Sequence, residues 1–295
     1  MNKHIFNIPI SALLIAGCFI SCKKNNLVID KVVTPPSYVK FNVRTAADTA
    51  NAIYYIKSDN TPFKIPIGIT TISDKDRTIN LCYSSPTAVA GIQYNAPATI
   101  VIPAGKALDS LSISGLFAGY PLSSKVDVLT IKICGGDVPA NSYWTTYKVT
   151  LRKYCDVIST DLIGSFANST DTYNGGASSK PNYTATVSNW TPISSTSASI
   201  VIKNLGATSD NGWGPFSATD PSLNPGLTAT IDWSSPSNFS VTIPLQNYFN
   251  DGSGMSTINA TTGTFSSCDQ TYTIVAKVKY AGNGSTYTHT SIFRR

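Results

Sequence analysis

The chain has 295 residues and a formal net charge of +6, with 13% of its residues charged and 42% hydrophobic. The hydrophobic content is sufficient to build packed cores, which argues against an intrinsically disordered protein. The cations are scattered along the sequence, whereas nucleic-acid binding requires a clustered basic patch, so the composition argues against a nucleic-acid partner.

The first 24 residues have the pattern of an export signal. Lys3 precedes an apolar run from Ile5 to Ile20 that is shorter than a membrane-spanning helix. Cys18 lies near the end of this run, in Ile-Ala-Gly-Cys, and Cys22 follows the run, in Ser-Cys-Lys-Lys. An ordinary signal peptide with incidental cysteines is one interpretation of this pattern.

The end of the run also resembles a bacterial lipobox, in which a diacylglyceryl group is attached to the cysteine thiol. The Ser-Cys-Lys-Lys version is similar to Bacteroidota lipoproteins. The resemblance implies lipidation at Cys22, with Cys18 as the alternative. It implies an outer-membrane protein with a lipid anchor, which holds stably when more than one acyl chain is present. We expect it on the cell surface, and an anchor that faces the periplasm is the alternative.

The remaining chain is predicted to be all-β, because short β-branched runs recur between Gly, Pro, Asn and Ser clusters. We expect a signal peptide over residues 1–21 and a tether over 22–37, where tandem proline disfavours regular structure. An Ig-like β-sandwich is expected over 38–154. A second antiparallel sandwich or barrel-like domain is expected over 155–295.

Seven strands are predicted in the first domain and about eight in the second. The first set is Tyr38–Val43, Phe63–Ile67, Thr78–Tyr83, Ala98–Ile102, Ser110–Ile113, Val126–Ile133 and Thr146–Tyr154. The second set is Leu162–Phe166, Tyr183–Val187, Ala198–Leu205, Leu227–Trp233, Ser240–Pro244, Gly263–Ser267, Tyr272–Tyr280 and Ser285–Phe293. Residues 167–181 are predicted to form a polar loop or loose hairpin.

The stretch from Ser84 to Tyr94, followed by Ile102–Lys106 and Leu111–Ile113, resembles the core of Calx-beta-like Ig sandwiches. It is also similar to the first domain of Bacteroidota surface lipoproteins of unknown function. The family has an Asp before its Tyr, and Gln93 stands at that position here. Calcium requires several carboxylate and carbonyl oxygens, so the resemblance implies the fold without a metal.

Four cysteines follow the leader: Cys82, Cys134, Cys155 and Cys268. An even number in an exported chain indicates disulfides, and four cysteines allow three pairings. Cys82 with Cys134 and Cys155 with Cys268 are favoured, and four buried free thiols are the alternative. The spacing does not match a zinc site.

Little in the sequence indicates an enzyme. His289 is the only histidine after the leader, and no Gly-x-Ser-x-Gly motif accompanies it. Every acidic residue is an Asp, a residue type common in turns. We expect no catalytic residues, no metal and no cofactor.

Aromatic residues between turn residues are the better candidates for a binding site, because such sites tend to lie on loops. Trp213 follows Asp210 and Asn211 in Asp-Asn-Gly-Trp-Gly-Pro-Phe, where the ring could stack on a sugar and the neighbours could hydrogen-bond to it. Tyr248 and Phe249 precede Asn-Asp-Gly in a similar combination. The alternative is that Trp213 folds back and caps the end of the domain.

The expected protein is a non-enzymatic envelope lipoprotein that binds glycans or captures nutrients. The alternative is a protein–protein interaction or adhesion module with an envelope or host protein as its partner. The membrane is the expected partner of the lipid anchor.

Overall fold

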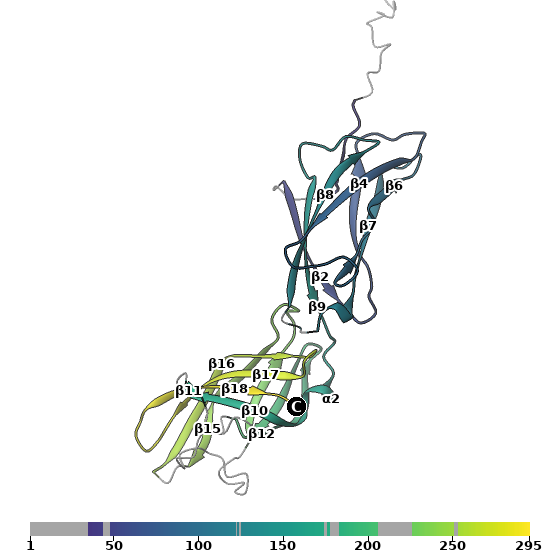
Figure 1. Cartoon of the computed structure of the whole chain (residues 1–295). Coiled ribbons are helices and arrows are strands. Elements are labelled where there is room, and N and C mark those ends of the chain that lie inside the picture. The colour runs from purple at the N-terminus through teal and green to yellow at the C-terminus, as the bar shows by residue number, and fades with distance from the viewer. Residues whose placement is uncertain are drawn as a thin grey trace, which may run out of the picture. The chain divides into compact units, whose positions relative to one another are not determined.

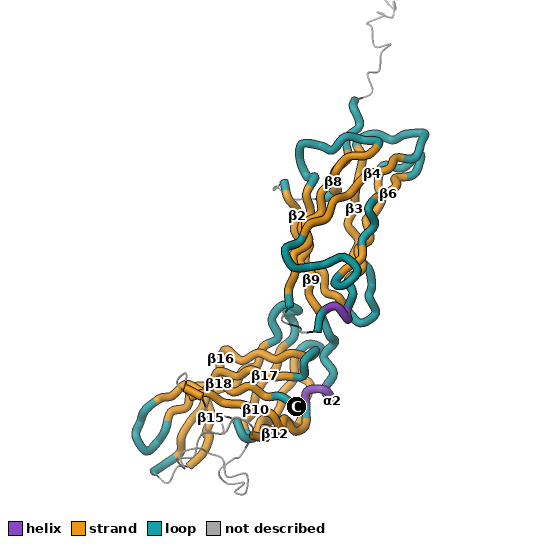
Figure 2. The backbone as a smooth tube through the Cα atoms, in the orientation of Figure 1, coloured by secondary structure: helices purple, strands orange, loops and turns teal. Residues whose placement is uncertain are grey.

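The computed structural model describes residues 35–43, 48–121, 123, 125–173, 176–177, 183–205, 226–250 and 253–295. These residues form β-strands with two very short helical segments, η1 (Phe117–Gly119) and α2 (Ser159–Leu162), shown in purple in Figure 2. Neither is long and apolar enough to cross a membrane. The all-β prediction is confirmed. The strands in Figure 1 enclose two separate hydrophobic cores, one built from residues 39–151 and one from residues 162–293.

The first nine strands form a sandwich of two sheets. One sheet has the order β1-β3-β7-β5 and the other β2-β9-β8-β4-β6. Alternate side chains of both sheets, such as Ile67 and Leu129, are fully buried between them. The strands are β1 (Val39–Phe41), β2 (Thr49–Ile56), β3 (Phe63–Ile69), β4 (Arg77–Ser84), β5 (Tyr94–Asn95), β6 (Thr99–Ile102), β7 (Leu108–Gly115), β8 (Val126–Gly136) and β9 (Thr146–Lys153).

Seven of these strands match predicted ones, and β2 and β5 were not predicted. Strand β2 pairs in parallel with β9, from Thr49 opposite Thr146 to Ile56 opposite Lys153. Its buried residues Ala50, Tyr54 and Ile56 are interrupted by the half-buried Ala52. The outward positions also hold apolar residues, Ile53 and Tyr55, so the alternation of β2 is weak in the sequence.

Eight later strands form a closed antiparallel barrel. Each strand from β12 to β18 pairs with the next, and β10 pairs with both β12 and β18 to close the sheet, with β11 as an extra strand on β10. Inward side chains such as Ile200, Ile231 and Ile274 fill the interior. The strands are β10 (Gly164–Tyr173), β11 (Gly176–Ala177), β12 (Tyr183–Ser194), β13 (Ser197–Lys203), β14 (Leu227–Asp232), β15 (Ser240–Asn250), β16 (Met255–Ser266), β17 (Thr271–Lys279) and β18 (Thr286–Phe293).

Of the two predictions for residues 167–181, the loop is wrong for the first part, because β10 continues to Tyr173. The hairpin agrees with the antiparallel pairing of β10 with β11. The pairing of β10 with β12 shifts register between Phe166 and Ser169. After this shift the inward positions are Ser169 and Asp171, both buried. Polar residues at inward positions gave the segment the composition of a loop.

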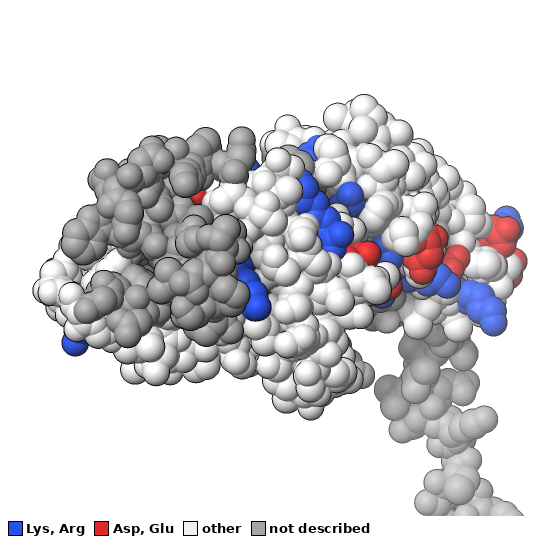
Figure 3. Space-filling view, turned by 90° about the horizontal axis from the view of Figure 1, so that it is seen from below, with Lys and Arg blue, Asp and Glu red and all other residues white. Residues whose placement is uncertain are grey.

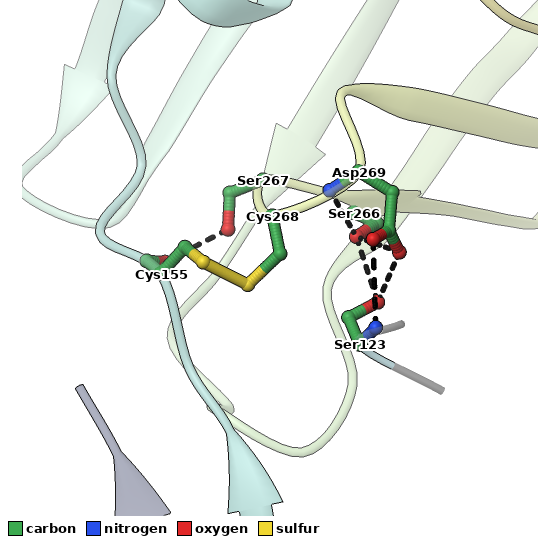
Figure 4. The surroundings of a disulfide bond; sticks show 6 residues. All are labelled: Ser123, Cys155, Ser266, Ser267, Cys268 and Asp269. Atoms are coloured by element: carbon green, nitrogen blue, oxygen red, sulfur yellow. Dashed lines mark hydrogen bonds between the residues drawn. A yellow bond between two sulfur atoms is a disulfide. The ribbon is translucent and has the colours of Figure 1, made fainter. Parts of the chain in front are cut away.

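Both favoured disulfide pairings are present. Cys82 bonds Cys134 across the neighbouring strands β4 and β8, and Cys155 bonds Cys268 in the turn between β16 and β17. Beside the second bond, Ser267 Oγ donates a hydrogen bond to the Cys155 carbonyl at 2.8 Å (Figure 4). The turn is therefore held to the segment that precedes the barrel.

The same turn carries a small polar network, also drawn in Figure 4. Ser266 Oγ donates to Asp269 Oδ2 at 2.9 Å and accepts from the Asp269 backbone N–H at 3.1 Å. Ser123 Oγ contacts Ser266 Oγ at 2.9 Å and hydrogen-bonds Asp269. These contacts give the turn a defined conformation.

Candidate functional site

Polar and aromatic residues gather at one end of the barrel interior. We call this set the polar end and define it as Asp171, Tyr183, Tyr248, Tyr280 and His289. The side chains come from β10, β12, β15 and β18 and from the residue that follows β17. All five residues are buried, with exposed fractions of 9% or less.

Strand register places these residues together. Strands β10 and β18 pair with Asp171 opposite Ser291 and Tyr173 opposite His289. Ser169, two residues before Asp171 on β10, lies opposite Tyr183 at the start of β12. The polar end is therefore the barrel end at which β10 finishes and β12 begins.

Asp171 is the centre of the hydrogen bonding. Its Oδ2 lies 2.9 Å from Nδ1 of His289, and its Oδ1 accepts a hydrogen bond from Ser291 Oγ at 2.8 Å. The side chains of Asp171 and His289 are 0% and 3% exposed. A buried carboxylate needs such partners, because leaving it without them would cost several kcal/mol. The three residues therefore hold the closing strand pair in register and orient the carboxylate.

Tyr248 brings further hydroxyl groups to the same place. Burial raises its pKa well above the ordinary value, and the neighbouring Tyr280, Tyr183 and Asp171 raise the pKa further. Strand pairing agrees with this proximity, because Thr257 on β16 lies opposite both Asn247, which precedes Tyr248, and Lys279, which precedes Tyr280. Hydroxyls that both donate and accept, together with a fixed carboxylate, are suited to binding a polyhydroxylated ligand.

The hydroxyl of Tyr248 also donates a hydrogen bond to the carbonyl of Leu205. Leu205 is 1% exposed and ends the described part of the chain after β13. Asn204 fixes the same point, because its Nδ2 donates to the Thr184 carbonyl at 2.9 Å. Leu205 and Asn204 are thus attached to the polar end.

The arrangement is not that of a Ser-His-Asp catalytic triad. In a triad the histidine lies between the acid and the serine, so that it can take the serine proton. Here Asp171 lies between His289 and Ser291, and the serine donates to the carboxylate. The geometry orients an acid and does not activate a serine nucleophile.

The predicted binding residues have different outcomes. Asp210, Asn211 and Trp213 lie outside the described residues. Tyr248 was predicted next to an exposed turn, but β15 extends to Asn250 and the residue is only 3% exposed. Phe249 belongs to the same strand, and its side chain lies outside the described part. Of the predicted set, the structure brings only Tyr248 to the polar end.

Asp171 and Ser291 were not singled out from the sequence. A weak signal existed, because the alternation that ends with Phe293 puts His289 and Ser291 on the same face of the strand. Asp171 had no such signal, since its neighbours on β10 are polar. Pairing with a strand more than a hundred residues later decides its role.

In the sandwich, Gln93 has a structural role. It is 6% exposed, its Oε1 accepts from the Val89 N–H at 2.8 Å and its Nε2 donates to the Gly119 carbonyl at 3.2 Å. Gln93, which stands where Calx-beta-like sequences have an Asp, thus connects the segments that contain Val89 and Gly119. Among the described residues, no group of three or more His, Cys, Asp or Glu side chains could hold a metal ion.

Charged residues occupy a small part of the surface. On the face drawn in Figure 3, most Lys and Arg (blue) and Asp (red) side chains lie next to one another in one part of the view, with both signs mixed, and much of the remaining described surface there is uncharged. Lys57 and Asp156 form an exposed ion pair at 3.2 Å. Such pairs contribute little to stability.

No protein-family model and no curated protein matches the chain. Among solved structures it is similar to a multidomain protein including DUF1735 from Bacteroides ovatus, with 15% identity, 86% of this chain and 94% of that chain covered, and a TM-score of 0.31. It is also similar to an auxiliary nutrient binding protein from Bacteroides thetaiotaomicron, with 11% identity and a TM-score of 0.30. That match covers 85% of this chain and 94% of the other chain.

The third likeness is to the apo-form Calx CBD1 domain, with 10% identity, 40% of this chain and 96% of that domain covered, and a TM-score of 0.31. Both groups named by the sequence resemblance, Calx-beta domains and Bacteroides proteins, are therefore among the similar structures. At these identities and TM-scores the likenesses say nothing about what this chain binds.

Proposed function

We propose that the protein is a non-enzymatic outer-membrane lipoprotein that binds a glycan at the polar end of its barrel and serves as a nutrient-capture accessory on the cell surface. The observation that carries this proposal is the convergence of buried polar side chains at one barrel end. Asp171 is held there by His289 and Ser291. Strand pairing brings Tyr183, Tyr248 and Tyr280 to the same end. Sugar hydroxyls need partners that both donate and accept hydrogen bonds, and tyrosine and carboxylate oxygens provide them.

The attachment of Leu205 to Tyr248 supports the same site. The segment that begins after Leu205 contains Asp210, Asn211 and Trp213, the residues with the side chains expected to contact a sugar. Trp presents a large aromatic face that can stack on an apolar sugar face.

The test uses the chain from Lys23 onward, oxidised, on a panel of polysaccharides, followed by calorimetry with those that bind. We expect Trp213→Ala and Tyr248→Phe each to weaken binding by about tenfold, as expected for a lost stacking or hydrogen-bonding contact of about 1.4 kcal/mol. Tyr143→Phe, at an exposed position of the sandwich, is the matched control. Circular dichroism confirms that each variant is folded.

Absence of binding across the panel, or unchanged affinity in both variants, would contradict the proposal. Co-purification of a defined envelope protein that persists in Trp213→Ala would instead support an interaction or adhesion module. Turnover of a glycan that disappears in Asp171→Asn would show that the protein is an enzyme.

A further inference from the structure

Four exposed apolar side chains surround the point at which the chain enters the sandwich. Their exposed fractions are 38% for Tyr38, 66% for Ile72, 57% for Leu108 and 57% for Tyr143. They come from four separate parts of the sequence. Single exposed apolar residues are common, whereas several at one place indicate a contact surface. We call these four residues the entry surface.

Hydrogen bonds hold the backbone under the entry surface together. Tyr38 exchanges two hydrogen bonds of 2.9 Å with Thr70, next to the loop that carries Ile72. Val39 donates to the Pro139 carbonyl at 3.0 Å, in the loop that carries Tyr143. Ile69 donates to the Ala107 carbonyl at 2.9 Å, beside Leu108. The four side chains therefore lie at the same end of the sandwich on a fixed backbone.

The charges around these residues are mixed and are partly used in the loops themselves. Asp76 accepts a hydrogen bond from the Ala104 N–H at 2.8 Å, and Asp137 accepts one from Thr78 at 2.7 Å. Lys75 and Lys106 are exposed in the same loops. Neither positive nor negative charge dominates, so this surface does not favour a highly charged partner. Apolar side chains with interspersed charges suit the boundary between lipid headgroups and acyl chains.

The position of the anchor argues for the membrane as the occupant. Only fifteen residues lie between Cys22 and Tyr38, so these two residues are at most about 55 Å apart when the stretch is fully extended. A lipidated Cys22 would keep the entry surface at a high effective concentration beside the bilayer. At such a concentration, even a contact by four side chains is populated.

We propose that the entry surface lies against the lipid bilayer that holds the anchor, so that the sandwich is seated on the membrane at this end. This inference rests on the lipidation included in the proposed function. The contact is made by apolar side chains, so its strength should depend little on salt concentration.

The test couples the chain from Cys22 onward to a maleimide lipid in a phosphatidylcholine nanodisc. In the protein that starts at Cys22, this residue is the one cysteine outside the two disulfides, so coupling is site-specific. A lipid with a gadolinium-chelating headgroup then broadens the methyl NMR signals of residues near the bilayer. We expect at least twofold greater relaxation enhancement for Ile72 and Leu108 than for Ile193 and Leu245, which are exposed aliphatic residues of the barrel.

Two variants make the result specific. Ile72→Ser combined with Tyr143→Ser, both at exposed positions, should reduce the enhancement at Leu108 at least twofold, whereas Ile193→Ser should leave it unchanged. Equal broadening of all four aliphatic residues, or no change in the double variant, would overturn the inference. The coupling is chemical, so the result does not depend on lipidation in cells, and glycan binding is measured separately.

Discussion

Asp171 on β10 and His289 on β18 are joined by a 2.9 Å contact between Oδ2 and Nδ1 across the strand pair that closes the barrel. Both side chains are almost fully buried. With the carboxylate ionised, this contact requires a proton on Nδ1. The closure of the barrel and the orientation of its main polar group thus depend on the same two residues.

Asp171→Asn should lower the free energy of unfolding by about 1–3 kcal/mol, because an amide cannot accept hydrogen bonds from both His289 and Ser291 with all its atoms satisfied. Urea unfolding followed by far-UV circular dichroism measures the change. The matched control is Asp74→Asn at an exposed loop position, with an expected change within about 0.5 kcal/mol. Equal stability of both variants would contradict a structural role for Asp171.

Tyr83 should make stability fall at high pH. Its hydroxyl donates a hydrogen bond to the Pro97 carbonyl at 2.7 Å. Burial is the main cause and the nearby Tyr94 the second cause that raise the pKa of Tyr83 from the ordinary value of 10.0 to about 12. Since the folded pKa is the higher one, the stabilising contribution is complete below pH 10 and is lost as the pH rises through 12.

The measurement compares urea unfolding at pH 9 and pH 11.5. Tyr83→Phe cannot ionise at this position, so it should lose less stability between the two pH values than the wild-type chain does. Tyr143→Phe, at an exposed position, should behave as the wild type. Identical pH dependence in all three proteins would show that Tyr83 ionises equally in the folded and unfolded states.

The two disulfides should each stabilise their own hydrophobic core. They join residues 52 and 113 positions apart, and removing a native disulfide typically costs about 2–5 kcal/mol. We expect Cys155→Ala with Cys268→Ala to lower the unfolding midpoint reported by Trp190 and Trp233, which pack on the barrel core. Cys82→Ala with Cys134→Ala should instead lower the unfolding midpoint reported by Trp144. Unchanged midpoints in both double variants would contradict the expectation.

Gly119 is required by close packing of two backbones. A Cβ atom at this position would lie 1.9 Å from the carbonyl oxygen of Ile92, so Gly119→Ala forces the backbone apart at about 1–3 kcal/mol. Thermal unfolding measures the loss. The control is Ala118→Ser at the exposed neighbouring position, where little change is expected; an equal effect there would point to the helical turn itself.

Cys22→Ala should move the protein from the detergent phase to the aqueous phase in a Triton X-114 partition of whole cells, because the acyl chains would be missing. Cys18→Ala should leave the partition unchanged. The opposite pattern would assign lipidation to Cys18, and no change in either variant would indicate an ordinary signal peptide.

Strands with strong alternation were predictable. In β8, Leu129, Ile131 and Ile133 face the core in strict alternation, and the predicted strand matches all but its last three residues. The continuation of β10 was not predictable, because its inward residues Ser169 and Asp171 have the composition of a loop. Local patterns identify a strand by its apolar face, so a strand with a polar inward face escapes them.

The sequence by itself determined the all-β class, because short β-branched runs between turn residues are a local pattern, and it favoured the two cysteine pairs that the structure contains. The export signal stays a prediction. Only the tertiary structure decided that β10 pairs with β18, and that Tyr248 faces the interior instead of solvent. Asp171 and His289 are 118 positions apart. The burial of a polar residue depends on which distant strand covers it, and local composition does not encode that partner.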